Sequence, residues 1–384
     1  MPRPEVDALP KVLLIGVGGL GAVILEFLAR APGRRSMVLA GRDIVRITAR
    51  GNLATIGAMA QGCPPPDITC VPLDLRDEDA TADTISRLQP DLIVSTATMQ
   101  TWWLLDLLPP AAAAPLRRAG FGLWLPIHLA LTLRLMSAVR RAGFGGQVIT
   151  APFPDVVNPI LACLGLAPTC GIGNLDEIVP KLRLLAAARL QAPVATIKVS
   201  LVAHHALEPH AFGEPGELPP WFMRVARDGQ DVTELLDGEA LLRASYPITE
   251  GVAGHFLTAG SAVRLIQALL EEDETFLHAP APGGLPGGYP VLVGRSGVRP
   301  APIAGLSLEE AIQINKRSHP FDGIERIEPD GTVTFRPSTI EASRSVLGYP
   351  CDPLRPGEAE DRALELMERF TRYAGRHGVV LPAQ

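Results

Sequence analysis

Several features that define other classes of protein are scarce in this sequence. Only five cysteines occur among the 384 residues, and no two of them form a Cys-x-x-Cys pair. An odd number without that spacing argues against a disulfide framework and a zinc site, and it suits a reducing cytoplasm. The 35 lysines and arginines are outnumbered by 41 aspartates and glutamates, and the net charge is −6. Without a basic run, the chain offers no electrostatic footprint for a nucleic acid partner.

Long apolar runs are also few. The N-terminal stretch MPRPEVDALPK lacks the hydrophobic region that a signal peptide requires. The most apolar later stretch, FGLWLPIHLALTLRLMSAV, contains Pro126, His128 and Arg134. We expect it to be too short and too polar to cross a bilayer, and to form a buried helix instead. These features predict a cytoplasmic protein with no membrane partner.

What the sequence does contain is an alternation of short apolar runs and helical stretches over residues 1–150. Hydrophobic residues make up 47% of the chain, enough for two domains with cores of their own. The alternation predicts an α/β Rossmann fold, in which helices cover both sides of a doubly wound parallel sheet. A segment with a double proline and an alanine run, 99–121, is expected to be an irregular loop or lid. Strands are expected at 11–16, 36–41, 67–74, 91–98 and 146–151.

The pattern changes after residue 151 and predicts a second, α+β domain over 151–317. The remaining residues, 318–384, are expected to form an extension that begins with a hairpin at Asp330-Gly331. An amphipathic helix is expected at 358–374. We expect one side of this helix to contribute to the interface of a homodimer or higher homo-oligomer. That side carries Leu364, Leu366, Met367 and Phe370.

A glycine motif follows the first expected strand. Gly16, Gly18 and Gly21 have the spacing Gly-x-Gly-x-x-Gly, with a strand before them and a helix after them. In a dinucleotide-binding fold the first glycine allows the tight turn, the second the approach of the pyrophosphate, and the third close helix packing. The phosphates would lie on the free N–H groups of the helix start, beside Gly19 and Leu20. The alternative is a glycine-rich helix start without a ligand.

The end of the second strand points to the kind of dinucleotide. An NAD site requires an acidic residue there for the ribose hydroxyls, but this chain has Gly41 followed by Arg42. Glycine leaves room for a 2′-phosphate, and a guanidinium pairs well with it, so we predict NADP. Asp43 could still reach the ribose, or Arg42 and Asp43 could form a solvated pair. Further expected cofactor contacts are Asp74, Leu75, Thr96 and Ala97, with Arg46 and Arg50 as possible additions.

Two parts of the chain resemble known protein families. The segments GVGGLGA, LAGRD and LDLRDED resemble the dinucleotide-binding domain of saccharopine-dehydrogenase-like reductases. From about residue 150 to 317, the segments PDVVNPILACLGLAPTCGIGNLDEIVPKL, VSLVAHHALEPHAFG and GLPGGYPVLVGRSGV are similar, in order, to the lactate/malate dehydrogenase family. This resemblance implies that Asp176 corresponds to the family's motif aspartate and His205 to its catalytic histidine.

Such a pair suits reduction of a carbonyl or an imine. An imidazole can deliver the required proton near neutral pH, and a carboxylate can fix its tautomer. His204 precedes His205, and strand neighbours face opposite sides, so the register stays open between them. Structural roles for both histidines are the alternative. A metal site formed by His204, His205 and His210 is not expected, because adjacent histidines on a strand diverge.

The substrate clamp of the resembling family is incomplete in this chain. Val179 stands where that family has its substrate-binding arginine, and Pro152 stands where it has an asparagine. A simple lactate or malate reaction is therefore not expected. Candidate substrate contacts are Arg117, Asn158 and His128, although a solvated arginine and a core histidine are the ordinary roles. Trp102, Trp103 and Trp124 suggest a flat apolar substrate or simply core packing.

The sequence thus predicts an NADP-dependent oxidoreductase that reduces a ketone or imine of a small molecule, with a histidine as proton donor. Two alternative functions fit the same sequence features. One is a non-catalytic nucleotide-binding sensor or assembly protein. The other is an opine- or homospermidine-type reductase that first condenses an amine with a carbonyl.

Overall fold

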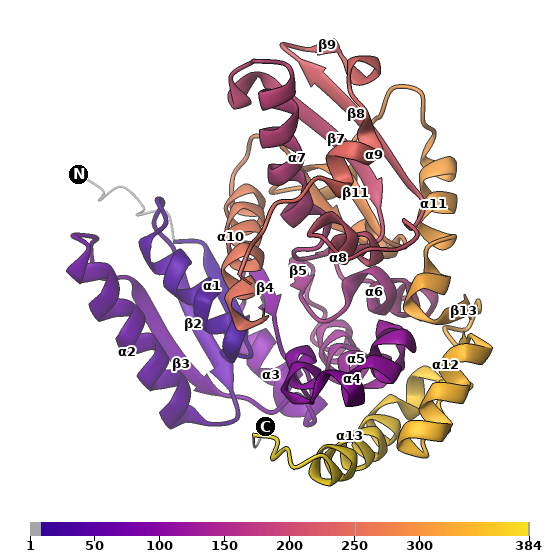
Figure 1. Cartoon of the computed structure of the whole chain (residues 1–384). Helices are drawn as coiled ribbons and strands as arrows, with labels where there is room; N and C mark the ends of the chain where they lie inside the picture. Colours follow the sequence, from indigo (N-terminus) through magenta and orange to yellow (C-terminus); the bar gives the residue numbers. More distant parts are fainter. Residues whose placement is uncertain (1–8, 250, 383–384) are drawn as a thin grey trace, which may run out of the picture.

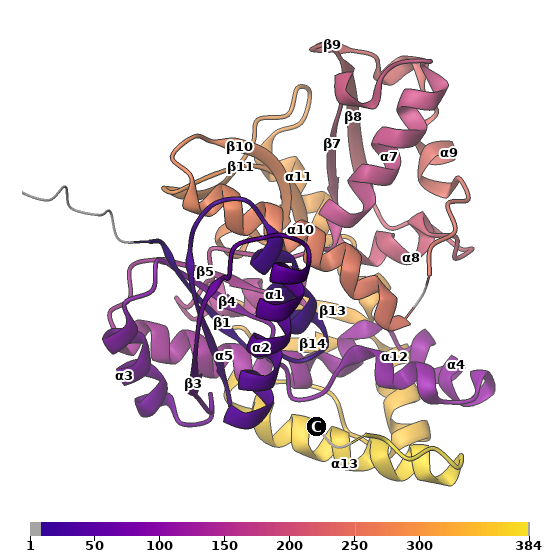
Figure 2. The same cartoon turned by 90° about the vertical axis from the view of Figure 1, so that its left-hand side faces the viewer.

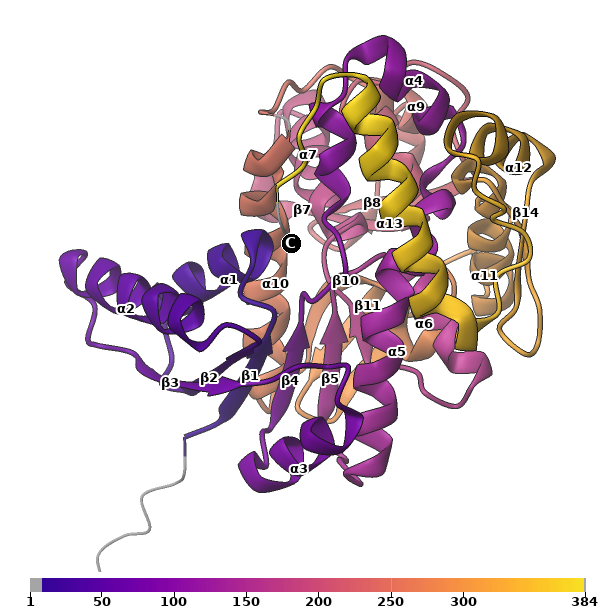
Figure 3. The ribbon, with the colours of Figure 1, turned by 90° about the horizontal axis from the view of Figure 1, so that it is seen from below.

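A parallel sheet forms the first part of the computed structural model, which describes residues 9–249 and 251–382. Part of the N-terminal stretch discussed above, residues 1–8, lies outside this description. The strands are β1 (Lys11–Ile15), β2 (Ser36–Gly41), β3 (Asp67–Pro72), β4 (Leu92–Ser95), β5 (Gln147–Thr150) and β6 (Cys170–Gly171). Their order, β3-β2-β1-β4-β5-β6, is the predicted doubly wound arrangement, and Figure 3 shows β3, β2, β1, β4 and β5 in this order. The domain boundary at residue 150 stays a prediction. The parallel sheet also includes β6, which pairs with β5 and ends at Gly171.

Helices cover both faces of this sheet because its strands are apolar on both sides. Along β1, Leu13 and Ile15 pack into one core, and Val12 and Leu14 into a second core on the opposite face. The first face is covered by α3 (Glu78–Leu88) and α5 (Leu125–Arg141). The second is covered by α1 (Gly19–Arg30), α2 (Ile44–Ala60) and α10 (His255–Leu270). The glycine motif lies between β1 and α1, as predicted.

The segment 99–121 is more regular than expected. It contains a 3-10 helix at Trp102–Leu107 and the helix α4 at Pro110–Arg118, so the expected irregular loop is wrong. Proline at the first turn of a helix is tolerated because its missing N–H would have no partner there. The following apolar stretch, Phe121–Arg141, is long enough to cross a membrane, contrary to our expectation, but 78% of its apolar window is buried inside the fold. It is therefore the buried helix that the sequence predicts.

The second part of the chain is built on a mixed α/β arrangement with an antiparallel sheet. Its strands are β7 (Ile197–Ala203), β8 (Trp221–Arg227), β9 (Gln230–Asp231), β10 (Thr275–Pro280), β11 (Gly288–Gly294) and β12 (Gly297–Pro300). The sheet order is β10-β11-β7-β8-β9, with β12 paired to β11. Its helices are α6 (Pro154–Cys163), α7 (Leu175–Arg189), α8 (Glu208–Ala211), α9 (Gly238–Arg243) and α11 (Leu308–Lys316). The long helix α10 returns from this part to pack along α1 (Figures 1 and 2).

The C-terminal part begins with the predicted hairpin, β13 (Ile324–Ile327) and β14 (Val333–Phe335), and continues through α12 (Pro337–Ala342) to α13 (Ala359–Arg376). Figure 3 shows α13 beside α5. Leu366 and Phe370 are buried in this contact, Met367 packs at its edge, and only Leu364 is largely exposed. This side of α13 therefore belongs to the chain's own core and is not the expected dimer surface. The homo-oligomer stays a prediction, and the apolar side of α13 no longer supports it.

Candidate active site

The glycine turn has the geometry that a pyrophosphate requires. Gly16 has φ +87°, and a Cβ there would lie 2.8 Å from the Ala97 backbone nitrogen. At Gly21 a Cβ would lie 2.3 Å from the Gly16 carbonyl oxygen, whereas at Gly18 it would meet nothing within 4 Å. Thr96 fastens the turn, because its hydroxyl donates to the Gly16 carbonyl. Two glycines therefore build the turn, and the third leaves its outer face open above the start of α1.

The neighbouring positions of the motif differ in their surroundings. Gly19 is exposed, and a Cβ there would lie 2.8 Å from Cε1 of His255, at the start of α10. Leu20 is half-buried and packs against the core beneath α1. The imidazole of His255 therefore lies beside the face of the turn that a phosphate would approach.

Arg42 directly follows the end of β2 and is exposed. Asp43 is engaged differently, because its Oδ1 accepts a hydrogen bond of 3.0 Å from the Arg46 N–H and so caps α2. Asp74 is exposed and accepts from the Arg76 N–H at 3.1 Å. Leu75 is 5% exposed and packs in the core, so its side chain is not free to contact a cofactor.

His205 lies just beyond the end of β7 and begins a short 3-10 helix, His205–Leu207. Its Nε2 is 2.8 Å from Oδ2 of Asp322, and Nδ1 of His204 is 3.3 Å from the same oxygen. The expected alternation of one inward and one outward histidine is therefore wrong, because β7 ends at Ala203 before the pair. His204 is completely buried, while the His205 side chain is 16% exposed. Of the two, His205 is the one that a substrate could reach.

The aspartate that pairs with His205 is Asp322 and not Asp176, the partner expected from the sequence. Asp176 lies at the start of α7, where its Oδ2 is 3.7 Å from the Arg264 guanidinium and its carboxyl is hydrogen-bonded to Ser261. Burial raises the pKa of Asp176, although Arg264 opposes the rise. The pairing of Asp176 with His205 is thus corrected to Asp322 with His205. Asp322 lies 117 residues from His205, in a 3-10 helix at His319–Asp322, and no local pattern marks it.

Charges around His205 favour its protonated form. Burial alone would lower the pKa of His205, but the charge of Asp322, its hydrogen bond, and the charge of Asp155 together raise it. Burial, together with the charge of His205, lowers the pKa of His204 well below its usual range. The raised pKa of His205 and the lowered pKa of His204 make His205 the more readily protonated of the two.

An aromatic layer joins this pair to the nucleotide edge of the sheet. The Phe121 ring stacks on His128 at 5.2 Å and meets His205 edge-on at 5.5 Å, and Phe153 lies 4.9 Å from His205. Nδ1 of His128 is 3.1 Å from the hydroxyl of Thr98, just after β4. Burial and the charge of His205 lower the pKa of His128 to about 4. His128 is therefore a neutral hydrogen-bonding group near the site and not its proton donor.

Two further polar residues lie on α6, directly after β5. Asp155 is fully buried, and its Oδ2 accepts from the side-chain amide of Asn174. Burial raises the pKa of Asp155 to about 6, with opposing effects from His205 and Asp322. Asn158 is also fully buried and accepts from the Thr150 hydroxyl at 3.0 Å. Asn158 thus braces the end of β5, and Asp155 is the group nearer to His205.

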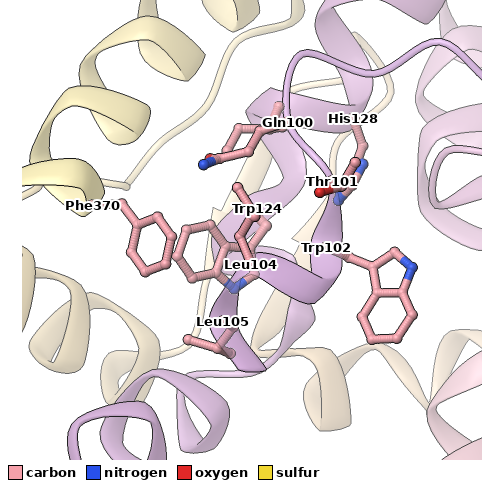
Figure 4. Close-up of a pocket in the computed structure, with 9 residues that line it drawn as sticks. Gln100, Thr101, Trp102, Leu104, Leu105, Trp124, His128 and Phe370 are labelled. Atoms are coloured by element: carbon pink, nitrogen blue, oxygen red, sulfur yellow. The ribbon is translucent and has the colours of Figure 1, made fainter. Parts of the chain in front are cut away.

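Arg117 lies outside this cluster, whereas Trp124 and His128 line one small cavity at its edge. Arg117 is exposed and pairs with Asp106 at 2.5 Å. A small cavity between Trp124, Phe370 and the segment 100–105 has a volume of about 10 Å³ (Figure 4), near the least that holds one water molecule. Trp124 meets Phe370 at 5.0 Å across α5 and α13. These aromatic rings fill the core, and the cavity is too small for a substrate.

The donor atoms of His204, His205 and Asp322 lie within 4.8 Å of one another, which is close enough to consider a metal ion. His210, the third histidine weighed from the sequence, instead has its Nδ1 3.1 Å from the Glu214 carbonyl. Bonds of about 2.1 Å in a tetrahedral zinc site keep ligand atoms about 3.4 Å apart. The 2.8 Å between His205 and Asp322 is shorter and fits a direct hydrogen bond.

Comparisons with known proteins agree with this fold. No family model and no curated protein sequence matches the chain. Among solved structures, it is similar to a lactate dehydrogenase from Eimeria maxima with NADH and oxamate (TM-score 0.53, 13% identity, 82% of this chain and 94% of that one). It is also similar to a malate dehydrogenase from Cryptosporidium parvum (0.53, 14%, 82% and 96%) and to a lactate dehydrogenase from the same organism with lactic acid and cofactor (0.52, 16%, 83% and 99%). The chain therefore has the fold of the lactate and malate dehydrogenases.

Proposed function

We propose that the protein is an NADP-dependent oxidoreductase that reduces the C=O or C=N bond of a small molecule. The observation that carries this proposal is the hydrogen-bonded pair of His205 and Asp322. It is joined through Phe121 and His128 to the end of β4, which lies beside β1 and the glycine turn. In doubly wound sheets, ligands bind at the carboxyl ends of the strands where the strand order reverses. In this sheet the reversal lies between β1 and β4.

The residues of the chain suit the binding of NADPH, which would supply the hydride. The first turn of α1 would hold the pyrophosphate above Gly18, and Thr96 and Ala97 would line the edge next to it. His205 would donate a proton to the oxygen or nitrogen of the substrate as that atom gains negative charge. Asp322 would hold the imidazole in one tautomer and stabilise its charged form. The buried layer of Phe121 and Phe153 would keep water from the reacting bond.

The choice of NADP over NAD rests on Gly41 and Arg42. Gly41 leaves the space that an acidic side chain would occupy, and Arg42 is exposed beside it. Asp43 already caps α2, which leaves it poorly placed to bind ribose hydroxyls. Fluorescence titrations with NADPH and NADH test this assignment. Tighter binding of NADPH is expected, and a preference for NADH would contradict it.

The reaction itself is tested by following NADPH absorbance with a panel of ketones, aldehydes and imines. The wild-type protein is expected to oxidise NADPH with at least one class, and His205→Asn is expected to lose about 10²- to 10⁴-fold in rate, the usual contribution of a general acid. His210→Asn is the matched control, because His210 is bonded to Glu214 on the surface. Tight NADPH binding without hydride transfer to any member of the panel would favour the non-catalytic alternative.

A further inference from the structure

The cluster around His205 is unusually rich in carboxyl groups. Asp322 and Asp155 both act on His205. Asn174 donates from its side chain to Asp155, and its backbone N–H donates to Glu177 at 3.2 Å. Burial raises the pKa of Glu177, and the carboxyl group of Glu208 in turn raises it further. Four carboxyl groups therefore follow one another across the site: Asp322, Asp155, Glu177 and Glu208.

Among the described residues, the basic side chains that pair with this cluster are His204 and His205, both at Asp322, and no lysine or arginine forms an ion pair with any of the four carboxyl groups. Besides burial, the charges of His205 and Asp322 shift the pKa of Asp155, and the charge of Asp155 shifts that of Glu208. The nearby Lys181 donates instead to the carbonyls of Ala211 and Leu242. A site for an anionic substrate would need the opposite arrangement, with arginine or lysine facing the reacting bond.

A capping box accounts for the buried Glu177 carboxyl, whereas only one of the two Asp155 carboxyl oxygens has a hydrogen-bond partner among the described residues. Glu177 forms a capping box with Asn174 at the start of α7. Asp155 is 0% exposed, and its Oδ1 has no hydrogen-bond partner among residues 9–249 and 251–382. A buried carboxylate oxygen without a partner is costly. An N–H donor on a ligand would give this oxygen, Oδ1 of Asp155, the hydrogen bond that it lacks.

We propose that the substrate reduced at this site carries a cationic nitrogen, as an ammonium or iminium group, that donates to Asp155 and is held by the carboxyl cluster. The inference rests on the proposed function for its reaction but concerns the charge of the substrate. Asp155 itself is 0% exposed, and the partly exposed residues of the cluster are Asn174, His205 and Glu208, so a small amine would approach from their side. A cation there would replace the missing basic side chain and complete the hydrogen bonding of Asp155.

Protons should be released when such a cation binds. Burial raises the pKa of Asp155 to about 6 and that of Glu208 to about 7, so both are partly protonated near neutral pH. A bound cation favours their ionised forms. The other titratable groups facing the cluster are the carboxyls of Asp322 and Glu177, the phenol of Tyr289, and the imidazoles of His204, His205, His128 and His319. Amine affinity should therefore rise between pH 6 and pH 8, with proton release visible as a buffer-dependent binding enthalpy.

The experiment compares three probes of equal length and different charge: butylamine, butanol and butyrate. Isothermal titration to the full chain saturated with NADPH is expected to show butylamine binding at least tenfold more tightly than either other probe. Asp155→Asn is expected to weaken butylamine about 10- to 100-fold, the range for a hydrogen bond to a charged group. Asp106→Asn, at an exposed carboxylate paired with Arg117, is the control and should leave the affinity unchanged. If Asp155→Asn does not fold, Glu208→Gln serves in its place.

The possible results separate this inference from the proposed function. Equal or tighter binding of butyrate, or no binding of butylamine, would overturn the inference, even if NADPH is oxidised with a ketone. Butylamine binding that Asp155→Asn weakens would support it. A titration of butylamine without NADPH covers the remaining case: binding that Asp155→Asn weakens, together with no NADPH binding or no hydride transfer, would leave the cation site standing and refute the proposed reductase.

Discussion

Replacing Asp322 by asparagine tests the proposed proton donor most directly. The variant keeps the size of the side chain but removes the charge that faces Nε2 of His205 at 2.8 Å. A hydrogen bond to a charged group contributes about 1.5–3 kcal/mol, which corresponds to about 10- to 100-fold in the balance between protonated and neutral imidazole. Without it, burial lowers the pKa of His205 and only Asp155 opposes that effect. Less of the protonated donor would then be present near neutral pH.

The sign of the pH dependence follows from this shift. The pKa of His205 is raised in the folded protein, so the protonated donor is present at low pH and is lost as the pH rises through that raised value. The wild-type rate of reduction should fall on the alkaline side, and Asp322→Asn should move this fall to lower pH and reduce the rate at pH 7.5 by about 10-fold or more. Steady-state kcat/KM from pH 5.5 to 9 is the assay, with His210→Asn as control. An unchanged alkaline limb would refute the pairing, and a limb that moves in Asp176→Asn alone would restore the aspartate expected from sequence.

Three further predictions concern the cofactor and the fold. Arg42→Ala should weaken NADPH binding about tenfold while leaving NADH binding within a factor of two, because the lost contact is to the 2′-phosphate alone; equal losses in the two titrations would contradict this. Gly16→Ala should lower stability by about 1–3 kcal/mol and reduce NADPH affinity, because the residue has φ +87° and a Cβ would approach Ala97; denaturant unfolding and fluorescence titration check both effects. Phe370→Ala should cost about 3–5 kcal/mol of unfolding free energy, since its ring is 1% exposed, whereas Leu364→Ala on the exposed side should cost less than about 1 kcal/mol.

The Rossmann half could be predicted from the sequence because its signals are local. Apolar strands such as β1 and the glycine motif after it depend on neighbours within a few residues. The hairpin at Asp330-Gly331 and the helix α13 were predictable for the same reason. The helix α4 in the segment 99–121 was not, because its proline and alanine residues are compatible with either a loop or the start of a helix.

The site could be predicted only in part. His205 was proposed through its resemblance to a strand-ending histidine, and no local pattern separated it from His204. The prediction that the two histidines face opposite sides was wrong, because β7 ends at Ala203 and includes neither of them. Asp322 could not be found, because only the folded chain brings it to His205 from 117 residues away. Asp176, which matched a motif, is instead engaged by Arg264.

The position of Asp322 links the C-terminal part of the chain to the proposed chemistry. The turn that carries it lies against Gly120, where a Cβ would come within 2.4 Å of the Asp322 backbone, so only glycine allows this approach. The hydroxyl of Thr339 donates to the Ala119 carbonyl at 2.6 Å and fixes the same contact from the other side. Phe121, one residue after Gly120, stacks over His128 and meets His205. The contact that holds Asp322 thus also orients the aromatic layer, so residues after 317 complete the site rather than merely extend the fold.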